Sequence, residues 1–507
     1  MVKVMTAEDA VKTYIKDGMT IATNGFVGAV QPEGMMRAIQ ASFLRDGTPR
    51  NLTLLHAAGQ GGGKDAEGNV VGQVNRLAEE GLLKCVIAGH YSLAPRIQKL
   101  AMENKIAAYN MPQGCLSELF REIASGRPGL LTHVGLDTFV DPDVEAGMLN
   151  DKAREAGSYV QKVSFNGEDK LFYPSIPIDV TLIHASYVDT MGNCSLEREG
   201  TLADILPIAQ AAYNSGGKVI VTVEKSHFVQ YGTLDTRLIQ VPGIYIEAVV
   251  LVDQACARQT NGSYHNEAFS GEKKIPLSAM DPMPMGARKI IARRCAMELK
   301  AGDVVNLGIG MPEGIANVVA EEGIEGMVLT TESGTIGGVP ASGGDFGVTT
   351  NPDSIIHQSF QFDFYDGGGL DIAFLGLAQC DSHGNINVSK FGPKIAGCGG
   401  FINITQNTPV VIFCGTFTVK GGHKKFLRDV EQITFSAEFA NKTGQKVLYV
   451  TECCVFKLTK EGVELIEVAP DISIEKDILP FMDFTPIMKD VRLMDERIFK
   501  DEVMGLA

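Results

Sequence analysis

The sequence has 507 residues, of which 45% are apolar and 21% are charged. This ordinary mixture excludes a disordered or fibrous chain, and at about 150 residues per domain it predicts two or three globular domains. Acidic residues outnumber basic ones by 61 to 45, which gives a net charge of −16. Because nucleic acids and anionic membranes attract proteins with an excess of Lys and Arg, neither is expected as a partner.

Nothing in the sequence indicates a membrane or a secretory route. No apolar run approaches the roughly 18 residues that would predict a membrane-spanning helix. The first residues mix Lys, Glu and Asp, which a signal peptide does not do. The ten cysteines are scattered and form no C-x-x-C pair, so neither a zinc ribbon nor a thioredoxin-like site is suggested. We therefore expect a cytoplasmic protein without a metal site.

The predicted elements alternate between helices and short apolar strands. Thr6 and Asp9 have the spacing of a capping box, ahead of a helix that we expect to reach Gly18. A second helix is predicted over 287–299, and the apolar runs 218–224 and 409–417 predict buried strands. This alternation is typical of an α/β fold with largely parallel sheets flanked by helices. In such folds, ligands bind beyond the carboxyl ends of the strands.

The two halves of the sequence repeat one another. KDGMTIATNGFVGAVQPEG (16–34) corresponds to KAGDVVNLGIGMPEG (300–314), since each joins an apolar strand to a Gly-rich turn that closes on Pro-Glu-Gly. The turn D-T-M-G-N, which begins at Asp189, likewise corresponds to D-S-H-G-N, which begins at Asp381. The shared order predicts two homologous domains.

The domain limits follow from the repeat and from composition. We predict an N-terminal domain over 1–255 and a C-terminal domain over 287–507. The segment 256–286 contains Asn-Gly, Ser-Gly and the Pro-rich stretch DPMPMG, which is typical of a linker.

One acidic residue is placed where chemistry is expected. Glu332 follows the predicted strand MVLT and precedes Ser333, Gly334 and two further glycines, so a ligand could approach it closely. Aligning NLTLLHAAGQGGG (51–63) with GMVLTTESGTIGG (326–338) puts Ala57 opposite Glu332. A residue needed for the fold should recur in both halves, whereas a reacting residue needs to occur once. A solvated Glu on a tight turn is the structural alternative.

Together with these features, the sequence resembles the family I coenzyme A transferases, of the single-chain type in which two subunit-like halves are fused. The resemblance extends over nearly the whole chain and includes GFVGAVQPE, NLGIGMPE, LTTESGTIGGVP and the long segment 361–409. Its closest pattern is that of the propionate or acetate type, acting on short-chain acyl-CoA. One departure is Asn24-Gly25-Phe26, where the family usually has Gly-Gly-Phe, and this leaves the choice of acyl group open.

The resemblance implies a ping-pong transfer of coenzyme A through a covalent glutamyl-CoA thioester on Glu332. Coenzyme A would enter as the acyl-CoA substrate, with short-chain carboxylic acids of the acetate, propionate or butyrate type as acceptors and no permanently bound cofactor. The side-chain amide of Gln113 and the backbone N–H of Gly400, or secondly of Gly399, would stabilise the oxyanion, at about 3–4 kcal/mol for each donor.

The resemblance also implies a set of residues that contact coenzyme A. These residues are Gly308, Ile309, Gly310, Met311, Pro312, Ala396, Gly399 and Lys420. Because coenzyme A is strongly anionic and this chain is acidic overall, nearby lysines should make a local positive entrance to the site. The candidates are Lys390, Lys394, Lys420, Lys424 and Lys425.

Two other functions remain open from the sequence. An acyl-CoA hydrolase using the same Glu332 would consume the thioester without an acceptor acid, and a non-catalytic acyl-CoA sensor could share the fold. A sensor usually has an added DNA-binding segment, and no basic helix-turn-helix stands out here. Related enzymes suggest a homo-oligomer, either a tetramer or a dimer.

Overall fold

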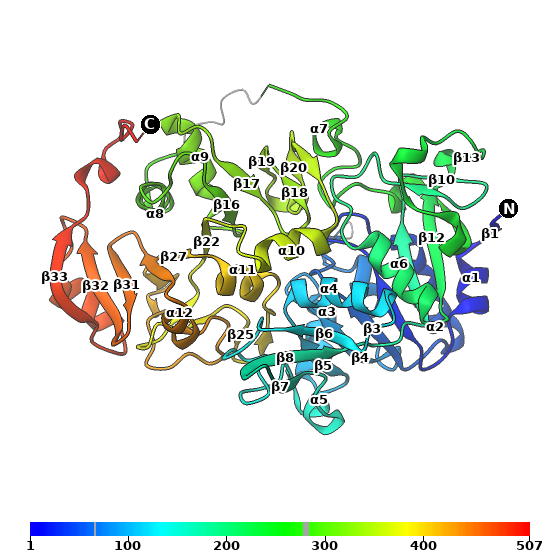
Figure 1. The fold of residues 1–507 in the computed structure, drawn as a ribbon, viewed down its shortest axis with the longest axis horizontal. Helices are drawn as coiled ribbons and strands as arrows, with labels where there is room; N and C mark the ends of the chain where they lie inside the picture. Colours follow the sequence, from blue (N-terminus) through cyan, green and yellow to red (C-terminus); the bar gives the residue numbers. More distant parts are fainter. Residues whose placement is uncertain (65–66, 277–282, 507) are drawn as a thin grey trace.

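The computed structural model describes residues 1–64, 67–276 and 283–506. Within these residues the chain forms two large sheets, one in each half of the sequence. Figure 1 shows the halves side by side, with the chain termini at opposite ends of the molecule and α4, α10 and α11 where the halves meet. The helices are α1 (Ala7–Tyr14), α2 (Glu33–Asp46), α3 (Pro95–Met102), α4 (Gln113–Ala124), α5 (Asp151–Ala156), α6 (Ile205–Asn214), α7 (Glu267–Ser270), α8 (Ala287–Ala296), α9 (Glu313–Glu322), α10 (Gln358–Asp366), α11 (Phe401–Asn407) and α12 (Ala437–Thr443).

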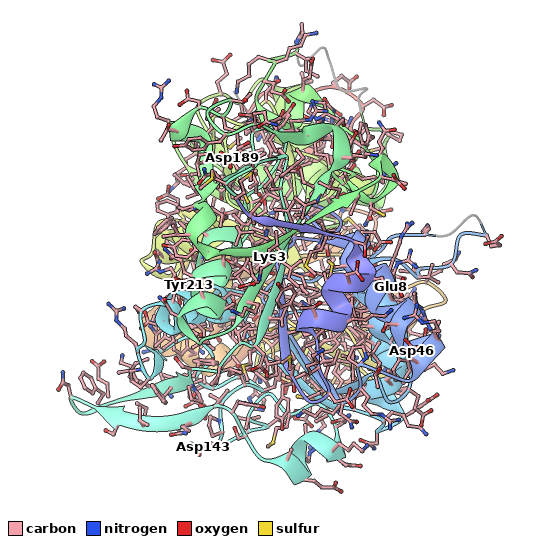
Figure 2. All side chains as sticks on the ribbon, turned by 90° about the vertical axis from the view of Figure 1, so that its right-hand side faces the viewer. Lys3, Glu8, Asp46, Asp143, Asp189 and Tyr213 are labelled. Carbon is pink, nitrogen blue, oxygen red and sulfur yellow. The ribbon has the colours of Figure 1, made fainter. Side chains whose placement is uncertain are left out.

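The sheet of the N-terminal half has eight strands among the described residues, and every neighbouring pair in it is parallel. In spatial order the strands are β1 (Lys3–Met5), β15 (Ile246–Val252), β12 (Lys218–Glu224), β9 (Val180–His184), β2 (Thr20–Thr23), β3 (Leu52–His56), β4 (Leu83–Ala88) and β5 (Ala107–Asn110). Figure 2 looks onto this half, with Lys3 on the edge strand β1, where its ammonium contacts Glu247 on β15 at 2.5 Å.

The sheet of the C-terminal half has ten strands in the part of the chain that the structure describes. Its centre, from β17 to β30, is parallel. Antiparallel pairs extend both sides, and the edge strand β33 pairs parallel with β32. In spatial order the strands are β21 (Ser354–Ile355), β18 (Thr335–Ile336), β17 (Val328–Thr330), β16 (Val304–Leu307), β22 (Ile372–Gly376), β27 (Val410–Cys414), β30 (Lys446–Val450), β31 (Cys454–Thr459), β32 (Gly462–Val468) and β33 (Ile487–Leu493). The predicted fold class, α/β with largely parallel sheets, is confirmed.

Six smaller sheets of two to four strands accompany the two large ones among the described residues. Their strands are β10 (Tyr187–Asp189), β11 (Cys194–Ser195), β13 (Phe228–Val229) and β14 (Ile239–Val241) in one sheet; β6 (Gly129–Thr132), β7 (Gln161–Phe165) and β8 (Glu168–Pro174) in another; and the pairs β19 (Val339–Pro340) with β20 (Thr349–Thr350), β23 (Gln379–Cys380) with β24 (Ile386–Asn387), β25 (Lys390–Phe391) with β26 (Lys394–Ile395), and β28 (Thr418–Val419) with β29 (His423–Lys424).

The repeated D-x-x-G-N turns have the same hydrogen bonds in both halves. Asp189 accepts from the backbone N–H of Met191 and Asn193, and its second oxygen accepts from the Asn193 amide at 2.9 Å. Asp381 accepts from the N–H of Asn385 at 2.9 Å and from the Asn385 amide at 3.0 Å. The recurrence in sequence therefore has a physical cause, since the aspartate closes the turn and the asparagine fills its second oxygen.

The predicted helix starts are accurate and the helix ends are not. Thr6 caps α1 by accepting from the Asp9 N–H at 3.1 Å, as the capping-box spacing predicts. The helix ends at Tyr14 rather than near Gly18, because Ile15 turns to an extended conformation and buries its side chain. The predicted helix over 287–299 likewise ends early, at Ala296.

The described part of the segment 256–286 packs against both halves. The Asn261 amide donates to Gly61 O at 2.9 Å, and the Thr260 hydroxyl donates to Asp345. Phe269 in α7 is buried. Residues 277–282 of the predicted linker lie outside the described residues.

Candidate active site

A cavity of about 580 Å³ lies where the two sheets direct their carboxyl ends at each other. Its lining includes the segments that follow β2, β3, β4 and β5 in one half and β16, β17, β22 and β27 in the other. This is the position at which α/β folds bind ligands. The lining residues include Phe26, Val27, His90, Ser92, Gln113, Gly308, Ile309, Met311, Glu332, Phe346, Leu377, Lys394, Ala396, Gly399, Gly400 and Lys425.

Glu332 lies two residues beyond β17 and lines this cavity. The turn around it is held by buried hydroxyls, since Thr331 Oγ1 lies 2.7 Å from Ser333 Oγ and 2.6 Å from Thr335 Oγ1. Gly334 has φ +100°, and a Cβ there would lie 2.0 Å from the oxygen of Ile356, so only glycine fits. Burial raises the pKa of the Glu332 carboxyl, because the charged form loses hydration.

The segment 396–400 joins the two halves at the cavity. Ala396 O accepts from the N–H of Tyr91 at 2.8 Å, and Cys398 N–H donates to the Asn110 side chain at 2.8 Å. Gly399 N–H donates to Gly89 O at 2.7 Å. Cys398 belongs to the hydrophobic core of the N-terminal half, although it is a residue of the C-terminal half. The segment is thus fixed by groups of the opposite sheet.

Gln113 and Gly400 line the same cavity as Glu332. Gln113 opens α4, is 4% exposed, and donates its main-chain N–H to Gly399 O at 2.9 Å. Gly400 lies against Glu332, because a Cβ on Gly400 would be 3.0 Å from Glu332 Cγ. Among the described residues no acceptor faces the N–H of Gly400, whereas that of Gly399 is already used by Gly89. Gly400 rather than Gly399 is therefore free to donate into the cavity.

The Gly-rich turn after β16 contributes part of its predicted set to the lining. Gly308, Ile309 and Met311 line the cavity, and Ile309 is 61% exposed. Gly310 and Pro312 shape the turn instead. Gly310 has φ +88° and its oxygen accepts from Arg288 at 2.7 Å, and Pro312 is the residue directly before α9.

Only two of the five predicted lysines line the cavity. Lys394 is exposed and lines the cavity, and Lys425 lines it from a buried position that lowers the pKa of its ammonium. Lys420 is exposed between β28 and β29 and does not contribute to the lining. Lys390 and Lys424 pair with Glu431 and Asp483 respectively.

Several lining residues were not singled out from the sequence. His90 and Ser92 follow β4, and Phe346 and Leu377 come from loops of the C-terminal half. The rule that ligands bind after parallel strands could have pointed to His90 and Ser92, since the run 83–88 is strongly apolar. Phe346 has no such signal, because a long irregular loop brings it to Phe26, with ring centroids 6.2 Å apart.

The described ranges offer neither a metal site nor a membrane-spanning helix. No group of three or more His, Cys, Asp or Glu side chains there could hold a metal ion. In the same part of the chain, no helix has both the length and the apolar character needed to cross a bilayer.

Comparison with known proteins agrees with this geometry. The model of the coenzyme A transferase family matches residues 4–251. A caffeate CoA-transferase of Acetobacterium woodii is 43% identical over 100% of this chain and 99% of its own length. An acetate CoA-transferase of Escherichia coli K12, YdiF, is 38% identical over 100% and 97%.

The fold comparison extends to solved structures. Crystal structures of the acyl-CoA transferase YdiF from E. coli O157:H7, as apoenzyme and as a thioester complex with CoA, have TM-scores of 0.91 and 0.90. Each covers 99% of this chain and 97% of its own, at 37% identity. The chain belongs to the coenzyme A transferase family. It is an enzyme of the acyl-CoA transferase class, for which coenzyme A is a substrate.

Proposed function

We propose that the enzyme moves coenzyme A from an acyl-CoA to a free carboxylic acid by way of a covalent glutamyl-CoA thioester on Glu332. One observation supports this most directly: Glu332 lies in a cavity shared by both halves, against Gly400, whose N–H has no protein acceptor among the described residues. A carboxylate beside a free backbone donor is what attack on a thioester carbonyl requires.

The reaction proceeds in steps that conserve the thioester. The Glu332 carboxylate attacks the thioester carbonyl, an acyl-glutamyl anhydride forms, and the CoA thiolate leaves. The thiolate then attacks the glutamyl carbonyl, which releases the first acid and joins Glu332 to the CoA sulfur. The acceptor carboxylate attacks this thioester and the same steps run in reverse. Burial of Glu332 favours attack, because a poorly hydrated carboxylate is higher in energy and more reactive.

Each attack places negative charge on an oxygen, and two donors are available for it. The Gln113 amide and the Gly400 N–H come from opposite halves and line the same cavity as Glu332. Loss of a single donor of this kind costs about 10²–10³ in rate. We assign the oxyanion site to Gln113 and Gly400. Gly399 would shape the segment, since its own N–H is occupied.

Coenzyme A would reach Glu332 along the turn after β16. Gly308, Ile309 and Met311 line this approach, with Gly310 and Pro312 setting the shape of the turn. Ala396 contributes to the opposite wall.

Of the basic groups near the cavity, we propose that Lys394 and Lys425, which line it, attract the anionic coenzyme A. Lys420, by its position on a separate hairpin, would contribute only at longer range.

For the acyl group we propose short-chain acids of the acetate, propionate and butyrate type. One relative that matches over the whole chain is named for acetate and another for caffeate, so the experiment must determine which size of acyl group this enzyme accepts. The 580 Å³ cavity must also hold the thiol end of coenzyme A, and its apolar walls include Phe26 and Phe346. A methylene changes binding by about 1–3 kcal/mol, so a rate series from acetyl-CoA to caffeoyl-CoA decides the class. The domain limits, the homo-oligomeric state and the cytoplasmic location stay predictions.

The test is to detect the adduct. Protein incubated with acetyl-CoA and no acceptor acid is trapped with borohydride or hydroxylamine, and the modified residue is located by mass spectrometry. We expect the label on Glu332, and we expect Glu332→Gln to lose both the label and CoA exchange while it unfolds like the wild type. Glu322→Gln, a buried acid outside the cavity, is the matched control. Labelling elsewhere, or exchange by Glu332→Gln, would contradict the mechanism. Thioester loss without an acceptor would indicate a hydrolase.

A further inference from the structure

A continuous line of buried polar side chains leads away from Gln113. The Gln113 Nε2 donates to Gln358 Oε1 at 3.0 Å, and Gln358 Nε2 donates to Asp204 Oδ2 at 2.7 Å. The other Asp204 oxygen accepts from the Ser117 hydroxyl. Asp204 and Gln113 are each 4% exposed, and Gln358 is fully buried.

The donor order along this line has a chemical cause. An ionised carboxylate only accepts hydrogen bonds, so the Gln358 side chain must turn its NH₂ group toward Asp204. Its oxygen then faces Gln113, and Gln113 can satisfy that oxygen only by presenting its own NH₂ group. One N–H of this NH₂ is used by Gln358, and no acceptor among the described residues takes the second. With Gln113 reversed, two amide oxygens would face each other in a buried site, at a cost of about 1–3 kcal/mol.

The main chain holds both partners of this line in place. The N–H of Gln358, the first residue of α10, donates to Ala203 O at 2.9 Å. The N–H of Asp204 donates to the Asn24 side chain at 2.8 Å. Asn24 is the residue that stands where the family pattern has glycine, and glycine could not make this bond. The line therefore begins and ends in the N-terminal half, passes through Gln358 of the C-terminal half, and has little freedom to rearrange.

We propose that Gln358 is a positioning residue. Because it donates to Asp204, it presents its oxygen to Gln113, and this keeps the Gln113 amide oriented with an N–H available to the reacting oxygen. This inference rests on the proposed role of Gln113 in the oxyanion site. Gln358 does not line the cavity, so it acts through Gln113 and not on the substrate.

The test is a set of variants assayed for the rate of glutamyl-CoA formation and for the dissociation constant of CoA. The buffer is held at about pH 8.5, because burial raises the pKa of Asp204 to about 7 and the carboxyl must be ionised. Gln358→Met keeps the shape and removes both polar groups. We expect it to slow adduct formation by at least about 10-fold, toward the 10²–10³ of a lost donor, with CoA affinity unchanged.

A compensating pair distinguishes orientation from packing. In Gln358→Glu combined with Asp204→Asn, the new amide donates to the new carboxylate, and that carboxylate accepts from Gln113. The bond between positions 358 and 204 is reversed, but Gln113 again donates to its partner and the net charge is unchanged. We therefore expect a rate within about 3-fold of the wild type, since matched partners couple in this way. Ser359→Ala, the neighbouring buried position of α10, is the control for helix packing.

A cycle with Gln113→Ala separates this inference from the proposed function. If Gln358 acts through Gln113, Gln358→Met adds no loss in the Gln113→Ala background. A wild-type rate in Gln358→Met, an equal loss in both backgrounds, or a compensating pair as slow as Gln358→Met would overturn the positioning role alone. A wild-type rate in Gln113→Ala would instead remove the oxyanion assignment. Should Gln358→Met not fold, Gln358→Asn, whose shorter amide cannot reach both partners, takes its place with the same expected loss.

Discussion

Replacing Gly400 with alanine tests how closely the backbone approaches the proposed nucleophile. The added Cβ would lie 3.0 Å from Glu332 Cγ and 3.3 Å from Phe362 Cζ, where ordinary contacts are 3.4–4 Å. Alanine is unstrained at the φ of −80° that Gly400 adopts, so the whole effect comes from this contact. Phe362 is fully buried and cannot move freely, so the carboxylate must shift by roughly half an ångström.

The size of the effect follows from this displacement. A misplacement of about 1 Å costs on the order of 100-fold in rate, so half of it should slow glutamyl-CoA formation by about 10-fold. Overpacking should also lower the free energy of unfolding by about 1–3 kcal/mol. Rapid quenching with intact-mass detection of the adduct measures the rate, and Gly286→Ala, whose new Cβ would meet nothing within 4 Å, is the matched control. A wild-type rate in Gly400→Ala would refute the close approach.

Two further expectations follow from charge. Burial raises the pKa of Glu332, and only its ionised form attacks. As the pH is lowered, kcat/KM for the acyl-CoA should therefore begin to fall at a higher pH than an ordinary glutamate would give. A stopped assay across the acid range checks this, and a midpoint at or below the ordinary value of about 4.3 contradicts it. Lys394→Ala should raise KM for acyl-CoA by roughly 2- to 5-fold at low salt, whereas Lys420→Ala, outside the cavity lining, should change it less; equal effects of the two variants would count against the proposed entrance.

Periodicity and internal repetition were sufficient to predict the fold class. The apolar run 218–224 is β12 throughout, and the predicted strand at 409–417 contains β27, because buried parallel strands need apolar residues on both faces. The antiparallel pairs that β31 forms with β30 and β32 were not predicted. Helix ends were also missed, as at Ile15, because tertiary burial and not local propensity decides where α1 stops.

The candidate site was predictable where residues directly follow a strand and not where distant loops converge. Glu332 and the turn that begins at Gly308 could be placed from the strands before them. The contact of Gln113 with Gln358 could not, because these residues are 245 positions apart and nothing in either local sequence indicates the pairing. Gly400 was named from the family pattern, and only the occupied N–H of Gly399 gives a physical reason to prefer it.

The segment 396–400 has a consequence for how the enzyme becomes active. Its residues are synthesised late, yet their partners Gly89, Tyr91 and Asn110 belong to the half that is synthesised first. The N-terminal half can therefore complete its sheet on the ribosome before the segment 396–400, which contributes to the cavity wall, has been made. Activity begins only when the later half docks, and a chain cut between the halves should recover turnover only as fast as the two pieces find each other.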